Sequence, residues 1–209
     1  YGVEIKDTFH GLTAVNLIDG STKHFNAEQC RFGYRDSFFK QEGKGKFIIT
    51  QVTFRLSKNP VINTTYGAIS SQLQSMHITA PTIRDVSNAV IAIRQSKLPD
   101  PKVIGNAGSF FKNPEISMKQ FMELQSKYPE IVGYKTQSDH MKVAAGWLIE
   151  QSGWKGKRVG NTGMHDKQAL VLVNYGNAVG SELIEHAKRV QSGVKEKFNI
   201  ELEMEVNII

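Results

Sequence analysis

Alternating hydrophobic and polar residues in parts of the first quarter of the chain predict β-strands there. Residues 12–18 and 22–25 flank Asp19-Gly20, a dipeptide typical of a hairpin turn. Residues 47–56 alternate along their whole length and predict one long strand. The chain therefore opens with a strand-rich region.

Beyond this region the period changes from two residues to that of a helix. The polar stretch 62–75 first predicts an extended surface loop centred on Tyr66. Residues 81–97 then predict a helix with Pro81 in its first turn, and the prolines within 98–101 end it. One apolar stripe follows the helical period: Ile83, Val86, Val90 and Ile93.

The second half mixes helices and strands. Ser117 and Gln120 have the spacing of a capping box, which predicts that a helix over 118–127 begins there. The other expected elements are a short buried helix over 142–151, a fully buried strand over 169–173, a helix capped by Ser181 and ending near Phe198, and a strictly alternating strand over 201–206.

These elements predict an α+β fold. We expect a β-rich part over 1–57, a loop and connecting helix over 58–98, and an α/β part over 99–199. The last residues, 200–209, are expected to return to the first part as a strand.

Charge and cysteine content narrow the possible partners and compartment. The 26 basic and 20 acidic residues give a net charge of +6, which favours anionic ligands. The basic residues are scattered and form no nucleic-acid reader motif, so nucleic-acid binding has little support. A single cysteine fits a reducing cytoplasm, and no apolar run is long enough to span a membrane.

The stretch GNAGSFFKNP, residues 105–114, raises a question about Ser109. A serine in a glycine-rich turn commonly bonds to its own backbone. Alternatively, the glycines bring a ligand close while Phe110 and Phe111 anchor the hydroxyl, which could then donate a proton to a developing carbanion.

Other polar residues have both an ordinary and a functional interpretation. Arg35 either pairs with Asp36 at the surface or presents its guanidinium to a carboxylate. Glu205 lies either on a solvated strand face or beside a substrate. Lys97 and Lys155 are either solvated charges or partners of a diphosphate. The six histidines have no metal-ligand spacing, so no metal site is expected.

Several stretches together resemble one family. CRFGYRDSFFK, KLPDPKVIGNAGSFFKNP, AAGWLIEQSGWKGKRVG and ELEMEV follow one another as in the UDP-N-acetylenolpyruvoylglucosamine reductases. The resemblance implies an oxidoreductase of CH–CH bonds that uses FAD and NADPH. Its substrate would be UDP-N-acetylglucosamine enolpyruvate and its product UDP-N-acetylmuramate, a peptidoglycan precursor.

The resemblance also implies roles for individual residues. Ser109 would be the proton donor, Arg35 would bind the enolpyruvyl carboxylate, and Glu205 would assist there. The implied substrate contacts are Tyr34, Lys97, Asn113, Lys155, Gln168 and Tyr66, the last being the loop tyrosine of the long branch of the family. Tyr1, Gly2 and Val3 resemble the end of a flavin-contacting segment.

One departure from the family qualifies these implications. No glycine-rich loop for the flavin diphosphate is present, and the chain starts without Met, already in strand-like alternation. We therefore expect the chain to contain a partial flavin domain over 1–57 and the substrate domain over 99–199. By itself it should bind little flavin and show little activity. We also expect it to be monomeric and cytoplasmic. The alternative function is a non-catalytic UDP-sugar-binding module.

Overall fold

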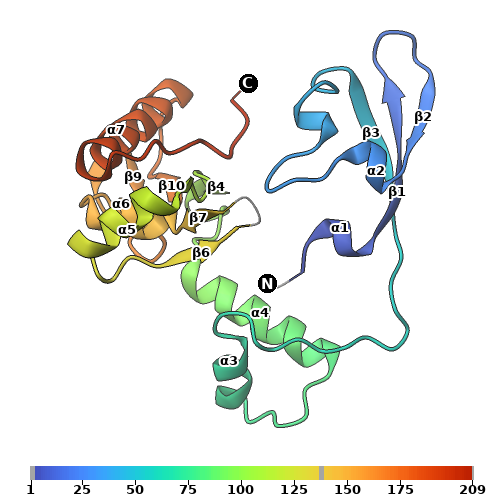
Figure 1. The fold of residues 1–209 in the computed structure, drawn as a ribbon, viewed down its shortest axis with the longest axis horizontal. Coiled ribbons are helices and arrows are strands. Elements are labelled where there is room, and N and C mark those ends of the chain that lie inside the picture. Colours follow the sequence, from blue (N-terminus) through green and yellow to red (C-terminus); the bar gives the residue numbers. More distant parts are fainter. Residues whose placement is uncertain (1–2, 137–138, 209) are drawn as a thin grey trace. The chain divides into compact units, whose positions relative to one another are not determined.

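The computed structural model describes residues 3–136 and 139–208, which form an α+β fold as predicted. It separates into two compact units, Tyr1–Ile93 and Arg94–Ile209 (Figure 1). Among the described residues, no helix is long and apolar enough to cross a membrane.

The first unit begins with an antiparallel sheet of order β2-β1-β3. The predicted hairpin is confirmed, since Val15 of β1 pairs with Thr22 of β2 and Gly20 takes a positive φ of 70° in the turn. The elements of this unit are α1 (Ile5–Thr8), β1 (Phe9–Asn16), β2 (Thr22–Phe25), α2 (Ala27–Cys30), the 3₁₀ helix η1 (Phe38–Lys40), β3 (Phe47–Phe54), α3 (Ile69–Ser75) and α4 (Ile83–Lys97), which continues from Arg94 on into the second unit.

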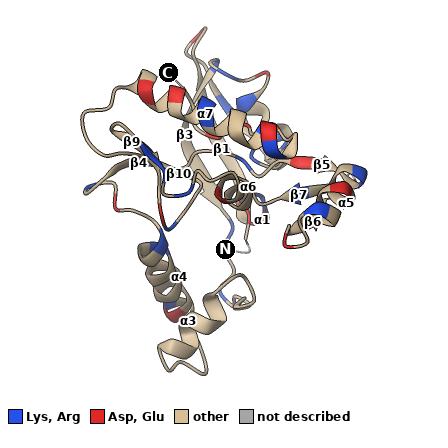
Figure 2. Cartoon of the chain, turned by 90° about the vertical axis from the view of Figure 1, so that its left-hand side faces the viewer, with Lys and Arg blue, Asp and Glu red and all other residues tan. Residues whose placement is uncertain are grey.

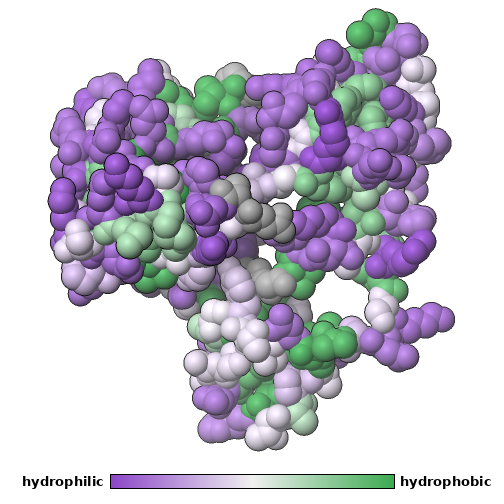
Figure 3. Space-filling model, in the orientation of Figure 1, coloured by the Kyte–Doolittle hydropathy of each residue, from purple (hydrophilic) through white to green (hydrophobic). Residues whose placement is uncertain are grey.

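A small aromatic core lies against this sheet. Phe25 and Cys30 are buried in it, and burial raises the pKa of the Cys30 thiol. The phenyl rings packed around them belong to Phe9, Phe32, Phe38, Phe39 and Phe47. The predicted strand β3 is present, but its apolar side chains are 42–55% exposed at Ile48, Ile49, Val52 and Phe54. Figure 3 shows hydrophobic residues at the surface of this unit.

A helical pair completes the first unit and corrects the predicted loop. Residues 69–75 form α3, because Ile69 and Leu73 share one helical face and are buried with Ala89 and Ile93 of α4. Helix α3 contains no charged residue, as Figure 2 shows. Most of its residues are polar, so its composition did not indicate that Ile69 and Leu73 form a buried face.

The predicted connecting helix is present as α4, but its first turn differs from the predicted one. Thr82 caps it: its Oγ1 accepts from the Asp85 N–H at 3.3 Å, and the Asp85 carboxylate accepts from the Thr82 N–H at 2.8 Å. Pro81 therefore precedes the cap. Ile83, expected on the buried stripe, is 60% exposed.

The second unit contains two antiparallel sheets, of orders β4-β10-β9-β8 and β5-β7-β6. Its elements are β4 (Gly105–Ser109), β5 (Glu115–Ser117), α5 (Met118–Lys127), β6 (Gly133–Lys135), β7 (His140–Val143), α6 (Ala145–Gln151), β8 (Arg158–Val159), β9 (Thr162–Met164), β10 (Val171–Asn174) and α7 (Gly180–Phe198). Figure 2 shows charges of both signs along α7.

Several predictions for the second unit are confirmed. Helix α5 has the predicted bounds, and the Ser117 Oγ accepts from the Gln120 N–H at 3.2 Å. The buried strand exists as β10, whose Val171 and Val173 are fully buried. Around it lies one core that also contains Leu148 of α6 and Val190 of α7.

Helices α6 and α7 begin at other residues than the sequence predicts. Lys142 and Val143 belong to strand β7, because Lys142 pairs with both Glu115 and Tyr134, and α6 starts only at Ala145. Helix α7 is preceded by Val179 rather than capped by Ser181. Its first turn is closed by a Glu182 carboxylate that accepts from the Val179 N–H at 2.9 Å.

The C-terminal residues, expected to return to the first part as a strand, pack within the second unit. Ile200 and Leu202 are buried in the core of the second unit, with Met204 and Val206 packed against it. The predicted alternation of faces holds, but the strand reduces to an isolated antiparallel bridge between Phe111 and Met204. Hydrophobic burial thus decided where this segment packs.

A buried histidine makes the stability of the second unit depend on pH. The His186 side chain is 2% exposed, and its Nδ1 lies 2.9 Å from the Thr162 Oγ1. Among the described residues, its Nε2 has no hydrogen-bond partner. Burial lowers the pKa of His186, and the nearby charges of Arg189 and Lys157 lower it further.

We predict that the second unit loses stability as the pH falls. In the unfolded chain His186 binds a proton near pH ~6.5, whereas the folded state resists protonation. Stability is therefore complete above that pH and declines as the pH falls towards the folded pKa. Urea unfolding followed by tryptophan fluorescence measures this unit, because Trp147 and Trp154 both lie in it. His186→Leu should flatten the decline, and an equally steep decline in this variant would contradict the prediction.

Candidate functional site

Ser109 ends strand β4, so GNAGS is a strand and not the flexible turn that its glycines suggest. Ser109 pairs with Val171 of β10 and is exposed. Phe110 and Phe111 behind it are 6% and 1% exposed, with ring centroids 5.4 Å apart. The two rings anchor the end of the strand in the core and leave the serine at its surface.

Glu205 lies on the segment that runs beside Ser109. The Glu205 N–H donates to the Phe110 carbonyl at 2.8 Å, and the Lys112 N–H donates to the Glu203 carbonyl at 2.9 Å. The fold thus brings two of the three predicted catalytic residues onto neighbouring backbone segments of one unit.

The three glutamates of ELEME are not equivalent. Glu201 and Glu203 are exposed and pair with Lys195 and Lys112, each at 2.5 Å. Glu205 is half-buried. The interpretation of a uniformly solvated strand face therefore fits Glu201 and Glu203 better than Glu205.

Two predicted substrate contacts meet at the first turn of α6. The Asn113 Oδ1 accepts from the Ala145 N–H at 2.9 Å, which leaves its amide N–H groups as the possible donors to a ligand. The Gln168 Oε1 lies beside Gly146, 3.6 Å from where a β-carbon would stand. Gln168 is tied to Ser109 through the next residues, since the Phe110 N–H donates to the Leu170 carbonyl at 2.8 Å.

The two candidate lysines differ in position. Lys97 is the last residue of α4 and is exposed. Asn113 bonds to the first turn of α6, whereas Lys155 follows the last turn. The length of this seven-residue helix, about 10 Å, therefore lies between the two. The Lys155 Nζ pairs with the Glu150 carboxylate at 2.7 Å. Lys155 is thus separated from Asn113 by the length of α6, and its charge is paired with that of Glu150.

Tyr34 and Arg35 form a tight turn in the first unit. Gly33 and Asp36 close it with backbone hydrogen bonds of 2.9 and 3.3 Å, and Arg35 takes a left-handed φ of 54°. The Asp36 carboxylate accepts from the Ser37 N–H at 2.8 Å and from the Gln41 Nε2 at 2.9 Å. This carboxylate stabilises the turn that presents Arg35.

The remaining predicted contacts also belong to the first unit. Tyr66 precedes α3 and is 52% exposed, and its carbonyl accepts from the Ile69 N–H at 3.3 Å. Of the three predicted flavin contacts, Tyr1 and Gly2 lie outside the described residues, and Val3 is 65% exposed. A contact between Val3 and a flavin therefore stays a prediction.

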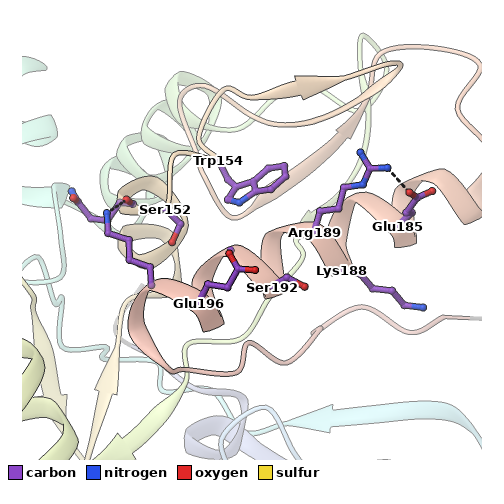
Figure 4. Close-up of a pocket in the computed structure, with 10 residues that line it drawn as sticks. Ser152, Trp154, Glu185, Lys188, Arg189, Ser192 and Glu196 are labelled. Carbon is purple, nitrogen blue, oxygen red and sulfur yellow. Dashed lines mark hydrogen bonds and ion pairs between the residues drawn. The ribbon is translucent and has the colours of Figure 1, made fainter.

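A hollow of about 760 Å³ lies elsewhere in the second unit, between the end of α6 and the outer face of α7. Figure 4 shows Trp154 above α7 and Arg189 directed to Glu185. Gly193 makes room for the indole, because a β-carbon there would lie 2.5 Å from the Trp154 Nε1. The hollow contains none of the predicted site residues. Within 3–136 and 139–208, no cluster of histidine, cysteine or acidic residues could hold a metal ion.

Comparison with known proteins identifies relatives of the whole chain. A sequence model of the C-terminal domain of UDP-N-acetylenolpyruvoylglucosamine reductase matches residues 100–209. The UDP-N-acetylenolpyruvoylglucosamine reductase of Flavobacterium johnsoniae is 55% identical over 210 residues, which cover 100% of this chain and 62% of that protein. That of Pseudomonas syringae pv. tomato is 50% identical over 208 residues, covering 100% and 61%.

A solved structure shares the fold. The crystal structure of UDP-N-acetylenolpyruvylglucosamine reductase from Thermus caldophilus aligns with a TM-score of 0.57 at 24% identity, over 98% of this chain and 54% of that one. The chain spans about three fifths of the curated relatives it matches, at 62% and 61% of their lengths.

Proposed function

Because the chain belongs to the UDP-N-acetylenolpyruvoylglucosamine reductase family, we propose that it supplies the substrate-binding and proton-donating parts of an oxidoreductase of peptidoglycan synthesis. The proposed reaction is reduction of UDP-N-acetylglucosamine enolpyruvate to UDP-N-acetylmuramate. The observation that carries this proposal is the hydrogen bond from the Glu205 N–H to the Phe110 carbonyl at 2.8 Å, which holds the segment of Glu205 beside that of Ser109.

The chemistry of the side chains supports this assignment. Hydride addition to the double bond of an enolpyruvyl group leaves negative charge on the neighbouring carbon and its carboxylate. Cations and hydrogen-bond donors stabilise that charge, and an exposed serine hydroxyl can give the proton that completes the reduction. We assign the carboxylate to Arg35, the proton to Ser109 and the assisting role to Glu205.

FAD and NADPH are the redox partners that family membership suggests. Among the three predicted flavin contacts, only Val3 belongs to the residues that the structure describes. We therefore assign the described side chains only to substrate binding and proton transfer. The proposed substrate contacts are Lys97, Asn113 and Gln168 in the second unit and Tyr34 and Tyr66 in the first, with Lys155 the weakest because Glu150 already pairs with it.

Binding of a UDP-sugar by the chain alone tests the first half of the proposal. We expect calorimetric titration with UDP-N-acetylglucosamine to detect binding, and Lys97→Ala to weaken it about tenfold or more through loss of a charge-assisted contact. Lys127→Ala, at the exposed end of α5, is the matched control and should bind normally. A wild-type chain that does not bind, or a Lys97→Ala chain that binds equally well, would overturn the assignment.

Catalysis needs a second experiment, because a UDP-sugar-binding module without activity is the alternative function. The grouping of Asn113 and Gln168 at α6 is equally compatible with that alternative. A chimaera that joins this chain to the unmatched part of the Flavobacterium johnsoniae relative separates the two. We expect it to oxidise NADPH only when the enolpyruvyl substrate is present. Sugar binding without any turnover would favour the binding module.

A further inference from the structure

Asn106, three residues before Ser109, makes side-chain hydrogen bonds on both sides of its amide. Its Oδ1 accepts from the Gly108 N–H at 3.1 Å. Its Nδ2 donates to the Ile104 carbonyl at 3.0 Å and to the Pro99 carbonyl at 3.3 Å. One half-buried amide therefore ties the residue before Ser109 to the turn that follows Lys97.

The strand is irregular where Asn106 acts. Val171 of β10 pairs with Ser109 and Val173 with Asn106, so the stretch between the two pairs is longer on β4 and the register shifts. Gly108 has a left-handed φ of 72° within this irregularity. Such a bulge redirects the side chain that follows it, and here that side chain is Ser109. The direction of the hydroxyl depends on a conformation that the Asn106–Gly108 bond stabilises.

We propose that Asn106 is a positioning residue for Ser109: it holds the bulge at Gly108 and joins it to the end of α4 that carries Lys97. This inference rests on the proposed function, which makes Ser109 the proton donor. Asn106 itself acts through Gly108 and through the carbonyls of Pro99 and Ile104.

The chain provides a matched control on the neighbouring strand. The Asn174 Oδ1 accepts from the Gly176 N–H at 2.9 Å and the Ala178 N–H at 3.2 Å, and its Nδ2 donates to the Ala178 carbonyl at 2.9 Å. Asn174→Ala removes the same number of side-chain bonds as Asn106→Ala, from the same sheet, without touching the bulge.

Amide hydrogen exchange on this chain tests the structural part. We expect Asn106→Ala to speed exchange of the Gly108 N–H about tenfold, because its acceptor is lost, while Asn174→Ala leaves it unchanged. Asn106→Asp keeps an acceptor for Gly108 but loses the donors to the Pro99 and Ile104 carbonyls, so it should retain part of the protection. Equal exchange at Gly108 in Asn106→Ala and in the wild type would overturn the proposal.

Steady-state kinetics of the chimaera tests the positioning role. Asn106→Ala should lower kcat about 100-fold with KM changed less than threefold, because a displaced proton donor affects chemistry more than binding. Asn174→Ala should keep both constants, and Asn106→Asp, which keeps the acceptor for Gly108 but loses both donors, should recover only part of kcat. An unchanged kcat in Asn106→Ala, or no recovery in Asn106→Asp despite restored protection, would overturn this inference. A chimaera that is inactive before any substitution would instead overturn the proposed function.

Discussion

Replacing Ser109 with alanine is expected to lower kcat of the chimaera by about 10²–10⁴-fold while KM changes little. The reason is chemical: alanine has no proton to donate to the carbon next to the one that receives hydride. Ser109 is exposed, so its loss should cost little stability. The measurement is NADPH oxidation at saturating enolpyruvyl substrate.

Ser117→Ala is the matched control for this experiment. It also removes one hydroxyl from the second unit, but that hydroxyl caps α5. We expect a loss of about 1 kcal/mol in stability and a normal kcat. If Ser109→Ala kept full activity, or if both variants lost activity equally, Ser109 would not be the proton donor.

The second large effect is expected for Phe111→Ala, which should destabilise the second unit by about 3–5 kcal/mol. Phe111 is 1% exposed, packs against Phe110 and pairs with Met204. Removing its ring leaves a cavity between β4 and the segment of Glu205. A typical domain is stable by only about 5–15 kcal/mol, so the loss is a large fraction of the total.

Urea unfolding monitored by tryptophan fluorescence measures this loss, and Phe111→Leu provides a graded comparison that should cost less. We also expect the Glu205 N–H to exchange faster in Phe111→Ala, because the ring supports the segment that bonds to Phe110. A loss below about 1 kcal/mol would show that Phe111 does not hold the site together.

Local chemistry in the sequence was sufficient to predict the elements whose ends carry their own signals. Asp19-Gly20 predicted the first hairpin, and Ser117 with Gln120 predicted the start of α5. The apolar run before Asn174 predicted the buried strand β10. In each case the signal and the structure lie within a few residues of one another.

Other elements had no such signal. Strand β4 contains two glycines in five residues, and it is a strand because β10 provides its hydrogen-bonding partner. The sequence of α3 is typical of a polar loop, and only the packing of Ile69 and Leu73 against α4 shows that a helix forms there. Strands β8 and β9 span two and three residues, too few to show a period.

The predicted site divides in the same way. Residue types and motifs were enough to nominate Ser109, Arg35, Glu205 and the substrate contacts, because each motif is contiguous in the chain. Tertiary structure alone brought Glu205 to Phe110, separated Lys155 from Asn113 by the length of α6, and revealed the three bonds of Asn106. The sequence by itself determined which groups are available for chemistry, whereas burial of Ile200, Leu202 and Phe111 in one core decided which of them are neighbours. The physical reason is that hydrophobic burial depends on the whole fold and leaves no local pattern from which its partners can be read.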